Sequence, residues 1–226
     1  MTQVSFGAVI FDCDGVLVDS EVLIHAIELE ALAECGLHYE SGAFKARFLG
    51  MSLPDYYAAL DVDAMERLGR SIQHELQPKM KERIRKMFDE QLAAVPGARA
   101  AVDAVTLPKA VASSSGIEAL DYKLKKVGLW DGFAPHVYSS EHVARAKPAP
   151  DLFLHAARKL GVAPADCLVI EDSVHGVTAG LAAGMTVWGF SGGGHMDESL
   201  SARLADAGAH QLVAHWAEAQ VLLAAL

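Results

Sequence analysis

Apolar and polar positions along the chain predict four buried strands. Each is a short run rich in β-branched and aromatic side chains that stops abruptly, as a strand covered on both faces does where it enters a functional loop. The runs lie at residues 4–11, 109–112, 167–170 and 185–190. The residues that follow them are Asp12; Ser113, Ser114 and Ser115; Glu171 and Asp172; and Ser191 with three glycines. We therefore expect polar or small residues at the end of every strand.

Helical stretches separate these strands. Residues 98–105, 117–127, 151–160 and 174–183 read as helices, and the last two are followed by glycines that end them. Strands that alternate with helices predict an α/β fold, in which a parallel sheet is covered by helices on both faces through right-handed crossovers. Ligands of such a sheet bind at the carboxyl ends of its strands.

One segment breaks the alternation. From about residue 20 to residue 94 the sequence reads as helices only, with Gly36, Gly50 and the turn Ser52-Leu53-Pro54 as punctuation. Val95-Pro96-Gly97 marks the return to the alternating pattern. We predict a catalytic core of residues 1–15 and 95–226, with a small all-helical cap domain inserted as residues 16–94.

Composition and charge narrow the possible partners. A chain of 226 residues that is 52% hydrophobic can bury a substantial core. Its formal charge of −10 disfavours a nucleic-acid partner. The apolar runs fall short of the roughly 20 residues that span a bilayer, so no membrane segment is expected. Three cysteines without C-x-x-C spacing favour the reducing cytoplasm. The oligomeric state stays open between a monomer and a small homo-oligomer.

The first predicted strand ends in two acids, Asp12 and Asp14. A calcium-binding EF-hand loop starting at Asp12 would need an acid or amide at Val16 and a glycine at Leu17, so that interpretation fails at both positions. Two carboxylates two residues apart can instead divide nucleophilic attack and proton transfer. Carboxylate nucleophiles are known in phosphoryl transfer.

A carboxylate that approaches a phosphate needs cations and hydrogen-bond donors beside it. The later strand ends supply candidates: Ser113 has a hydroxyl, Lys147 an ammonium, and Glu171 and Asp172 can bind a hard divalent cation such as Mg²⁺. Mg²⁺ between Asp12 and a phosphate oxygen would neutralise both.

These motifs together resemble the haloacid dehalogenase-like superfamily, in its phosphatase branch with a helical cap. They cover nearly the whole chain, and their order and spacing are far more specific than any one of them. The matching segments are Asp12-Cys13-Asp14-Gly15-Val16-Leu17-Val18-Asp19-Ser20; Ala112-Ser113-Ser114; Lys147-Pro148-Ala149-Pro150-Asp151; and Glu171-Asp172-Ser173 with the glycines 176, 180 and 184. The resemblance implies a Rossmann-like core.

The resemblance also implies roles for the acids. Asp12 would be the nucleophile, and Asp14 the general acid that protonates the leaving alcohol and then deprotonates the attacking water. Mg²⁺ would be held by Asp12, by the main-chain carbonyl of Asp14 and by Asp172, with Glu171 as a ligand through water.

Further residues would bind the substrate or orient the nucleophile. Ser113 and the N–H groups that follow it, beginning with Ser114, would hold phosphoryl oxygens, and Lys147 would orient Asp12. Ser115 is expected to cap the following helix. In the cap, the segment from Arg47 through Gly50 to Ser52 resembles the family's substrate-specificity loop; Arg47 either clamps a second anionic group or is an exposed arginine at a helix end.

We thus expect a Mg²⁺-dependent phosphatase for a small phosphorylated metabolite, a sugar phosphate or sugar-acid phosphate. The alternative is a phosphomutase of the β-phosphoglucomutase type. That branch has Thr at Ser20, His at Ile24 and Lys at Leu49, and these differences favour net hydrolysis. A haloacid dehalogenase would need neither Asp14 nor the metal-binding acids. A non-catalytic phosphate-binding protein is the remaining alternative.

Overall fold

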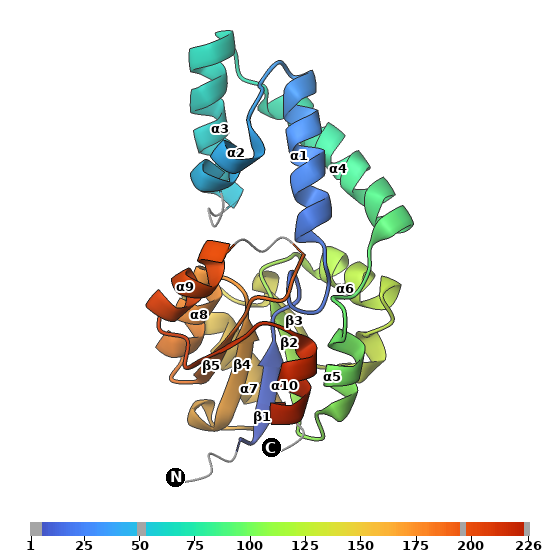
Figure 1. Cartoon of the computed structure of the whole chain (residues 1–226), viewed down its shortest axis with the longest axis vertical. Helices are drawn as coiled ribbons and strands as arrows, with labels where there is room; N and C mark the ends of the chain where they lie inside the picture. Colours follow the sequence, from blue (N-terminus) through green and yellow to red (C-terminus); the bar gives the residue numbers. More distant parts are fainter. Residues whose placement is uncertain (1–5, 49–52, 195–197, 224–226) are drawn as a thin grey trace. The chain divides into compact units, whose positions relative to one another are not determined.

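The structure is a computed structural model that describes residues 6–48, 53–194 and 198–223. Its contacts divide the chain into two compact units (Figure 1). The core unit comprises Met1–Ser20 and Leu92–Leu226, and the helical unit comprises Glu21–Gln91. The helical unit is therefore a few residues shorter at each end than the predicted cap of residues 16–94.

The core unit contains a six-stranded parallel sheet with the order β3-β2-β1-β4-β5-β6. Its strands are β1 (Ala8–Phe11), β2 (Lys109–Ser113), β3 (Val137–Ser139), β4 (Cys167–Glu171), β5 (Thr186–Phe190) and β6 (Gln211–Val213). This arrangement confirms the predicted α/β fold with a Rossmann-like parallel sheet. Because β2 and β4 pair with β1 on its two sides, the carboxyl ends of these three strands lie next to one another.

The helices predicted for the core unit are present, with ends that differ from the prediction by at most one residue. They are α5 (Ala98–Ala104), α6 (Ile117–Lys126), α7 (Asp151–Leu160) and α8 (Val174–Ala182). Two further helices, α9 (Glu198–Asp206) and α10 (Trp216–Leu223), and three 3₁₀ turns, Trp130–Gly132, Ser140–His142 and Pro164–Asp166, were not predicted.

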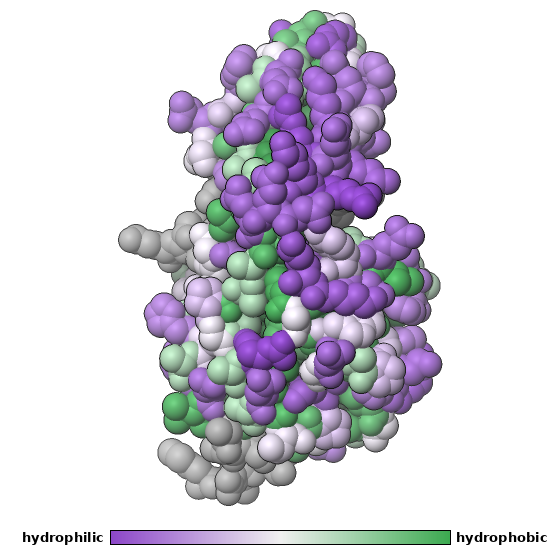
Figure 2. All heavy atoms as spheres, turned by 90° about the vertical axis from the view of Figure 1, so that its right-hand side faces the viewer, coloured by the Kyte–Doolittle hydropathy of each residue, from purple (hydrophilic) through white to green (hydrophobic). Residues whose placement is uncertain are grey.

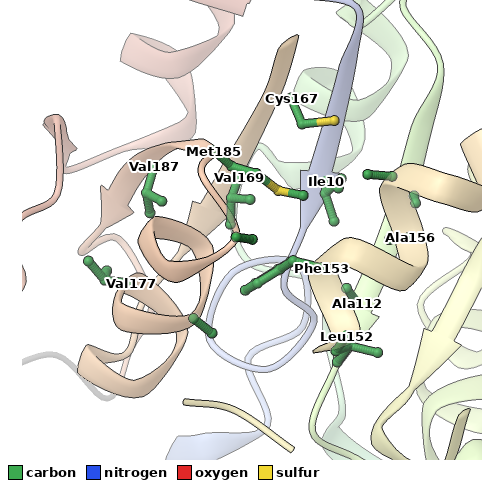
Figure 3. Close-up of a cluster of buried hydrophobic side chains, with 14 of the residues drawn as sticks. Ile10, Ala112, Leu152, Phe153, Ala156, Cys167, Val169, Val177, Met185 and Val187 are labelled. Atoms are coloured by element: carbon green, nitrogen blue, oxygen red, sulfur yellow. The ribbon is translucent and has the colours of Figure 1, made fainter. Parts of the chain in front are cut away.

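Helices α7 and α8 cover one face of the sheet. Phe153 of α7 and Val177 of α8 are fully buried and pack against strand residues such as Ile10 and Val169 (Figure 3). The exposed fraction of all four side chains is 0%. Side chains on alternate positions of β1 and β4 thus face this layer, as expected for strands buried on both sides.

An aromatic group covers the other face. Phe11 of β1 lies 5.5 Å from the ring centroid of Phe133 and 5.9 Å from that of Trp216 on α10. Phe190 of β5 stacks on Trp216 at 4.6 Å. The indole N–H of Trp216 donates to the carbonyl of Val16 at 2.9 Å, so α10 is attached to the loop that follows β1.

Two short segments connect the core unit with its insertion, and they pair with each other. The amide of Asp19 donates to the carbonyl of Ala93, and the amide of Val95 donates to the carbonyl of Leu17, both at 3.0 Å. An antiparallel bridge joins the residues between them. The chain therefore leaves and re-enters the core unit at adjacent positions.

The helical unit is formed by α1 (Glu21–Glu34), α2 (Ser41–Phe48), α3 (Leu53–Leu68) and α4 (Gln73–Gln91). It has its own apolar core, which includes Ile27, Leu32, Phe44, Leu60 and Leu76. The face of this unit drawn in Figure 2 is covered mainly by hydrophilic side chains. Across the described residues, no helix combines the length and hydropathy needed to cross a bilayer.

Candidate active site

The end of β1 and a tight turn place two acids close together. The amide of Asp12 continues the hydrogen-bond ladder of the sheet by donating to the carbonyl of Ile170 at 2.9 Å. Asp12 therefore begins the loop directly at the carboxyl end of β1. Gly15 has a φ of 77°, a left-handed conformation that glycine adopts without strain. The amides of Leu17 and Val18 both return to the carbonyl of Cys13 at 2.9 Å. The chain after Asp14 therefore forms a tight turn next to the carboxyl end of β1.

Lys147 lies at the centre of the first cluster. Its ammonium donates to Asp12 Oδ1 at 2.5 Å, to Glu171 Oε1 at 2.7 Å and to the carbonyl of Ala112 at 2.9 Å. The exposed fractions of the Lys147, Asp12 and Glu171 side chains are 3%, 9% and 1%. The ends of β1, β2 and β4 thus meet at one buried cation, although Lys147 comes from the loop before α7.

Glu171 is held in place from its other oxygen. Oε2 accepts from the amide and the hydroxyl of Ser173 at 2.8 and 2.9 Å, and the Ser173 hydroxyl accepts from the amide of Gly176 at 3.0 Å as the N-cap of α8. A Cβ at position 176 would lie 1.8 Å from the Glu171 carboxyl carbon. The glycine at the start of α8 therefore makes room for the carboxylate that orients Lys147.

Asp14 forms a second cluster with different donors. Its Oδ2 accepts from the hydroxyls of Ser115 at 2.8 Å and Ser113 at 3.3 Å. Its Oδ1 accepts short hydrogen bonds from the Ser20 hydroxyl and the Lys123 ammonium. The site thus gives each of the two acids after β1 its own lysine.

The contacts of Lys123 were not predicted from the sequence, and the predicted role of Ser115 is wrong. The residue in the N-cap position of α6 is Gly116, so Ser115 does not cap the helix, and its hydroxyl donates to Asp14 instead. The sequence did contain a sign that Lys123 is buried. Lys123 lies between the buried residues Leu120 and Leu124 of α6, and a buried lysine needs an acidic partner.

Burial and charge shift the pKa values of these groups. Burial raises the pKa of Asp12 well above its ordinary value, and the carboxylates of Glu171, Asp172 and Asp14 add to this against the opposing effect of Lys147. Burial also opposes ionisation of Asp14, but the charge of Lys123 and the hydrogen bonds from Lys123, Ser20 and Ser115 together outweigh burial and lower the pKa of Asp14. The pKa of Asp12 is therefore raised, whereas the pKa of Asp14 is lowered.

The metal-binding prediction can be compared with the arrangement of the acids. Within residues 6–48, 53–194 and 198–223, no three His, Cys, Asp or Glu side chains are arranged to hold a metal ion. Both carboxyl oxygens of Asp14 and of Glu171 accept hydrogen bonds from protein donors, which leaves these oxygens less available as metal ligands. Asp12 and Asp172 are both buried, at 7% exposed, so their charges are costly without compensation.

The charges at the site test whether a cation suits it. The carboxylates of Asp14, Glu171 and Asp172 each raise the pKa of Asp12. Lys123 contacts Asp14, and Lys147 contacts Asp12 and Glu171. A divalent cation held by the acids that follow β1 and β4 would lower the repulsion among these carboxylates, and hard oxygen donors suit Mg²⁺. The residues present therefore fit such an ion.

The remaining predicted residues have other partners within their own units or lie outside the described part of the chain. Ser114 is exposed, and its carbonyl accepts from the Ser140 hydroxyl at 2.9 Å. Arg47, whose side chain is 46% exposed, forms an ion pair with Asp63 inside the helical unit. Gly50 and Ser52 lie outside the described residues.

Comparisons with known proteins agree with this fold and geometry. Residues 6–184 match the family model for haloacid dehalogenase-like hydrolases. The 6-phosphogluconate phosphatase of Escherichia coli strain K12 is 31% identical over 188 residues, which cover 83% of this chain and 84% of that protein. A haloacid dehalogenase-like protein of unknown function from Agrobacterium tumefaciens superposes with a TM-score of 0.86 at 36% identity, over 98% of this chain and 99% of that one.

A second solved structure shows a ligand. This hydrolase from Deinococcus radiodurans contains bound phosphate and sodium, and it superposes with a TM-score of 0.83 at 35% identity over 99% of this chain and 97% of that one. The expected enzyme class, a phosphoric monoester hydrolase, is confirmed by the family and its named phosphatases. Fold, site and comparisons lead to one conclusion: the chain belongs to the haloacid dehalogenase-like hydrolase family.

Proposed function

We propose that this enzyme removes phosphate from a small phosphorylated sugar or sugar acid, with Mg²⁺, through a phosphoryl group held transiently on Asp12. The observation that carries the proposal is the contact of Lys147 with both Asp12 and Glu171. It puts a fixed cation beside a buried carboxylate at the end of β1, where an anionic phosphoryl group would otherwise be repelled.

The first step transfers the phosphoryl group to the enzyme. A carboxyl oxygen of Asp12 attacks phosphorus, the bond between phosphorus and the sugar oxygen breaks, and Asp14 gives its proton to that oxygen. Asp14 rests as a carboxylate, since its pKa is lowered. A bound phosphate places like charge beside Asp14 and so favours the protonated form that the step requires.

The second step returns the enzyme to its starting state. Asp14 takes a proton from a water molecule, the water oxygen bonds to phosphorus, and the bond between phosphorus and Asp12 breaks to release inorganic phosphate. The buried hydroxyl of Ser113, which lies 3.3 Å from Asp14, is suited to donate to a phosphoryl oxygen in both steps. Lys147 keeps Asp12 oriented through its contact with Oδ1.

A divalent cation would be held by Asp12, Asp172 and the main-chain carbonyl of Asp14, and when bound it supplies charge that offsets the phosphoryl oxygens. Mg²⁺ commonly uses one or two carboxylates and takes its other ligands from water and substrate. This set differs from the sequence prediction in that the Glu171 carboxylate serves Lys147 and Ser173.

The substrate class rests on the relatives. The Escherichia coli protein named above is a 6-phosphogluconate phosphatase, and other relatives are named hexitol phosphatase and fructose-1-phosphate phosphatase. Phosphorylated sugars, sugar acids and hexitols are accordingly the first class of substrates to test.

The test is phosphate release from a panel of sugar, sugar-acid and hexitol phosphates, with Mg²⁺ and with a chelator. Wild-type enzyme should release phosphate in the presence of Mg²⁺ but not in the presence of the chelator. Asp12→Asn should be inactive under both conditions. Borohydride reduction during turnover should convert the phosphorylated Asp12 into homoserine, which mass spectrometry of the peptide detects.

Two results would contradict the proposal. Phosphate release that survives Asp12→Asn would show that another group attacks phosphorus. Phosphorus NMR can detect conversion of one phosphate isomer into another. Such conversion without release of phosphate would identify a mutase instead.

A further inference from the structure

We propose that Lys123 is a positioning residue for catalysis: it aims the Asp14 carboxylate at the oxygen of the leaving alcohol. This inference rests on the proposed function, because it assumes that Asp14 is the general acid. Lys123 belongs to none of the four motifs, and it comes from the middle of α6.

The contacts of Lys123 are those of a fixed support. Its ammonium contacts Asp14 Oδ1 and donates to the Ser115 hydroxyl at 2.7 Å, and that hydroxyl donates to Asp14 Oδ2 at 2.8 Å. Lys123 thus reaches one oxygen of the carboxylate directly and the other through Ser115. With both oxygens held, the carboxyl plane cannot turn freely about the bond that joins it to Cβ.

Helix α6 fixes the position of the ammonium. The Lys123 side chain is 4% exposed, and its neighbours on the buried side of the helix, Leu120 and Leu124, are 1% and 0% exposed. A lysine enclosed in this way has few alternative rotamers, unlike a lysine at the surface. The ammonium is therefore a rigid reference point for Asp14.

The two lysines of the site have separate tasks. Lys147 contacts Asp12 and Glu171, whereas Lys123 contacts Asp14 and Ser115. Since Asp14 is 17% exposed, it is the more accessible of the two acids to an entering alcohol oxygen. A small rotation of its carboxyl group would lengthen the path of the proton, and catalysis is sensitive to such misplacement.

The leaving group provides the test. An alkyl phosphate expels a basic alkoxide that needs a proton, whereas p-nitrophenyl phosphate expels an anion that is stable without one. The ratio kcat/KM reports the steps up to the first bond cleavage, so it isolates proton donation by Asp14. Lys123→Met should lower kcat/KM about 10- to 100-fold for the best sugar phosphate and by less than about threefold for p-nitrophenyl phosphate.

The matched control is Lys125→Met. Lys125 lies on the same helix, but its side chain is 57% exposed and pairs with Asp121 at 3.3 Å. This variant should keep wild-type kcat/KM for both substrates. Thermal unfolding of all variants measures loss of structure separately. An equal loss on both substrates in Lys123→Met would overturn the proposal, because damage to the fold does not distinguish leaving groups.

A second comparison decides the matter even if Lys123→Met does not fold. Asp14→Asn removes the buried charge that an isolated Lys123→Met leaves unpaired, so the double variant is neutral at both positions. If Lys123 acts only through Asp14, then Lys123→Met should not lower kcat/KM further in the Asp14→Asn background. Phenyl phosphate, whose leaving group is of intermediate basicity, keeps these rates measurable. A further loss of about tenfold would overturn the proposal.

The same experiments separate this inference from the proposed function. If Asp14→Asn itself spares the hydrolysis of alkyl phosphates, Asp14 is not the general acid and the proposed mechanism fails. If Asp14→Asn is selective for alkyl phosphates while Lys123→Met is not, only the role of Lys123 is refuted.

Discussion

The helical unit contains an acid whose ionisation opposes folding. Glu28 lies on α1, is half-buried, and accepts a hydrogen bond from the Tyr56 hydroxyl. Burial, with a smaller effect from the charge of Glu21, raises the pKa of Glu28 from an ordinary 4.5 to about 7. We predict that Glu28→Gln stabilises the helical unit at neutral and alkaline pH and has little effect in acid.

The magnitude follows from linkage between protonation and folding. A pKa raised from 4.5 to about 7 is equivalent to about 3 kcal/mol once the group is fully ionised in both states. The unfolded chain loses this proton more readily than the folded one, so the stability linked to Glu28 is present below the unfolded pKa. It falls as the pH rises through the folded pKa. Between about pH 5 and about pH 8 the loss is about 2.5 kcal/mol.

The assay is urea unfolding of the wild type and Glu28→Gln across that pH range. Far-ultraviolet circular dichroism follows the all-helical unit together with the helices of the core. The three tryptophans, Trp130, Trp188 and Trp216, all lie in the core unit, so their fluorescence follows the core alone. Glu30→Gln, an exposed acid on the same helix, is the matched control for loss of a charge.

The quantity that decides is the difference between the two free energies of unfolding as a function of pH. It should grow by about 2.5 kcal/mol toward alkaline pH for Glu28→Gln. A difference that stays constant from about pH 5 to about pH 8 would refute the reasoning, because it would mean that Glu28 ionises equally easily in both states.

Three further substitutions test other parts of the core unit. Gly176→Ala should lower kcat at least about tenfold, because its Cβ would displace the Glu171 carboxylate, while Gly42→Ala, which meets no atom within 4 Å, should not; steady-state kinetics compares them. Lys147→Arg should not rescue the activity lost in Lys147→Met, since a planar guanidinium cannot occupy the place of an ammonium with three acceptors; this is measured as phosphate release. Trp216→Ala should destabilise the core unit by about 3–5 kcal/mol in urea unfolding, because the indole is 1% exposed.

The sequence predicted the elements whose pattern is set by burial on two sides. The strands β1, β2, β4 and β5 are continuous apolar runs because both of their faces are covered, and such runs stand out in a sequence. Strands β3 and β6 are three residues long and lie at the sheet edges, where one partner strand and partial burial leave little pattern. Their existence depends on pairing with β2 and β5, which a local pattern does not contain.

The site was predictable only as far as its residues lie in motifs. Lys147 is 135 residues from Asp12 along the chain, yet its motif indicated a place beside Asp12. Ser20 belongs to the first motif, but the motif alone does not indicate its hydrogen bond to Asp14. Lys123 belongs to no motif, and the only local sign of its contact with Asp14 is that it falls among buried leucines of α6. Ser115 was misassigned because a serine before a helix is equally suited to cap it and to bind a carboxylate.

The paired segments at residues 17–19 and 93–95 make the insertion interchangeable. Both ends of the inserted segment are fixed at neighbouring positions of one short ladder, so the span that the insertion must close does not depend on its length. A hairpin turn or a segment of another size would satisfy the same two anchor points. Asp12 and Asp14 would keep their places at the carboxyl end of β1 whichever segment is inserted.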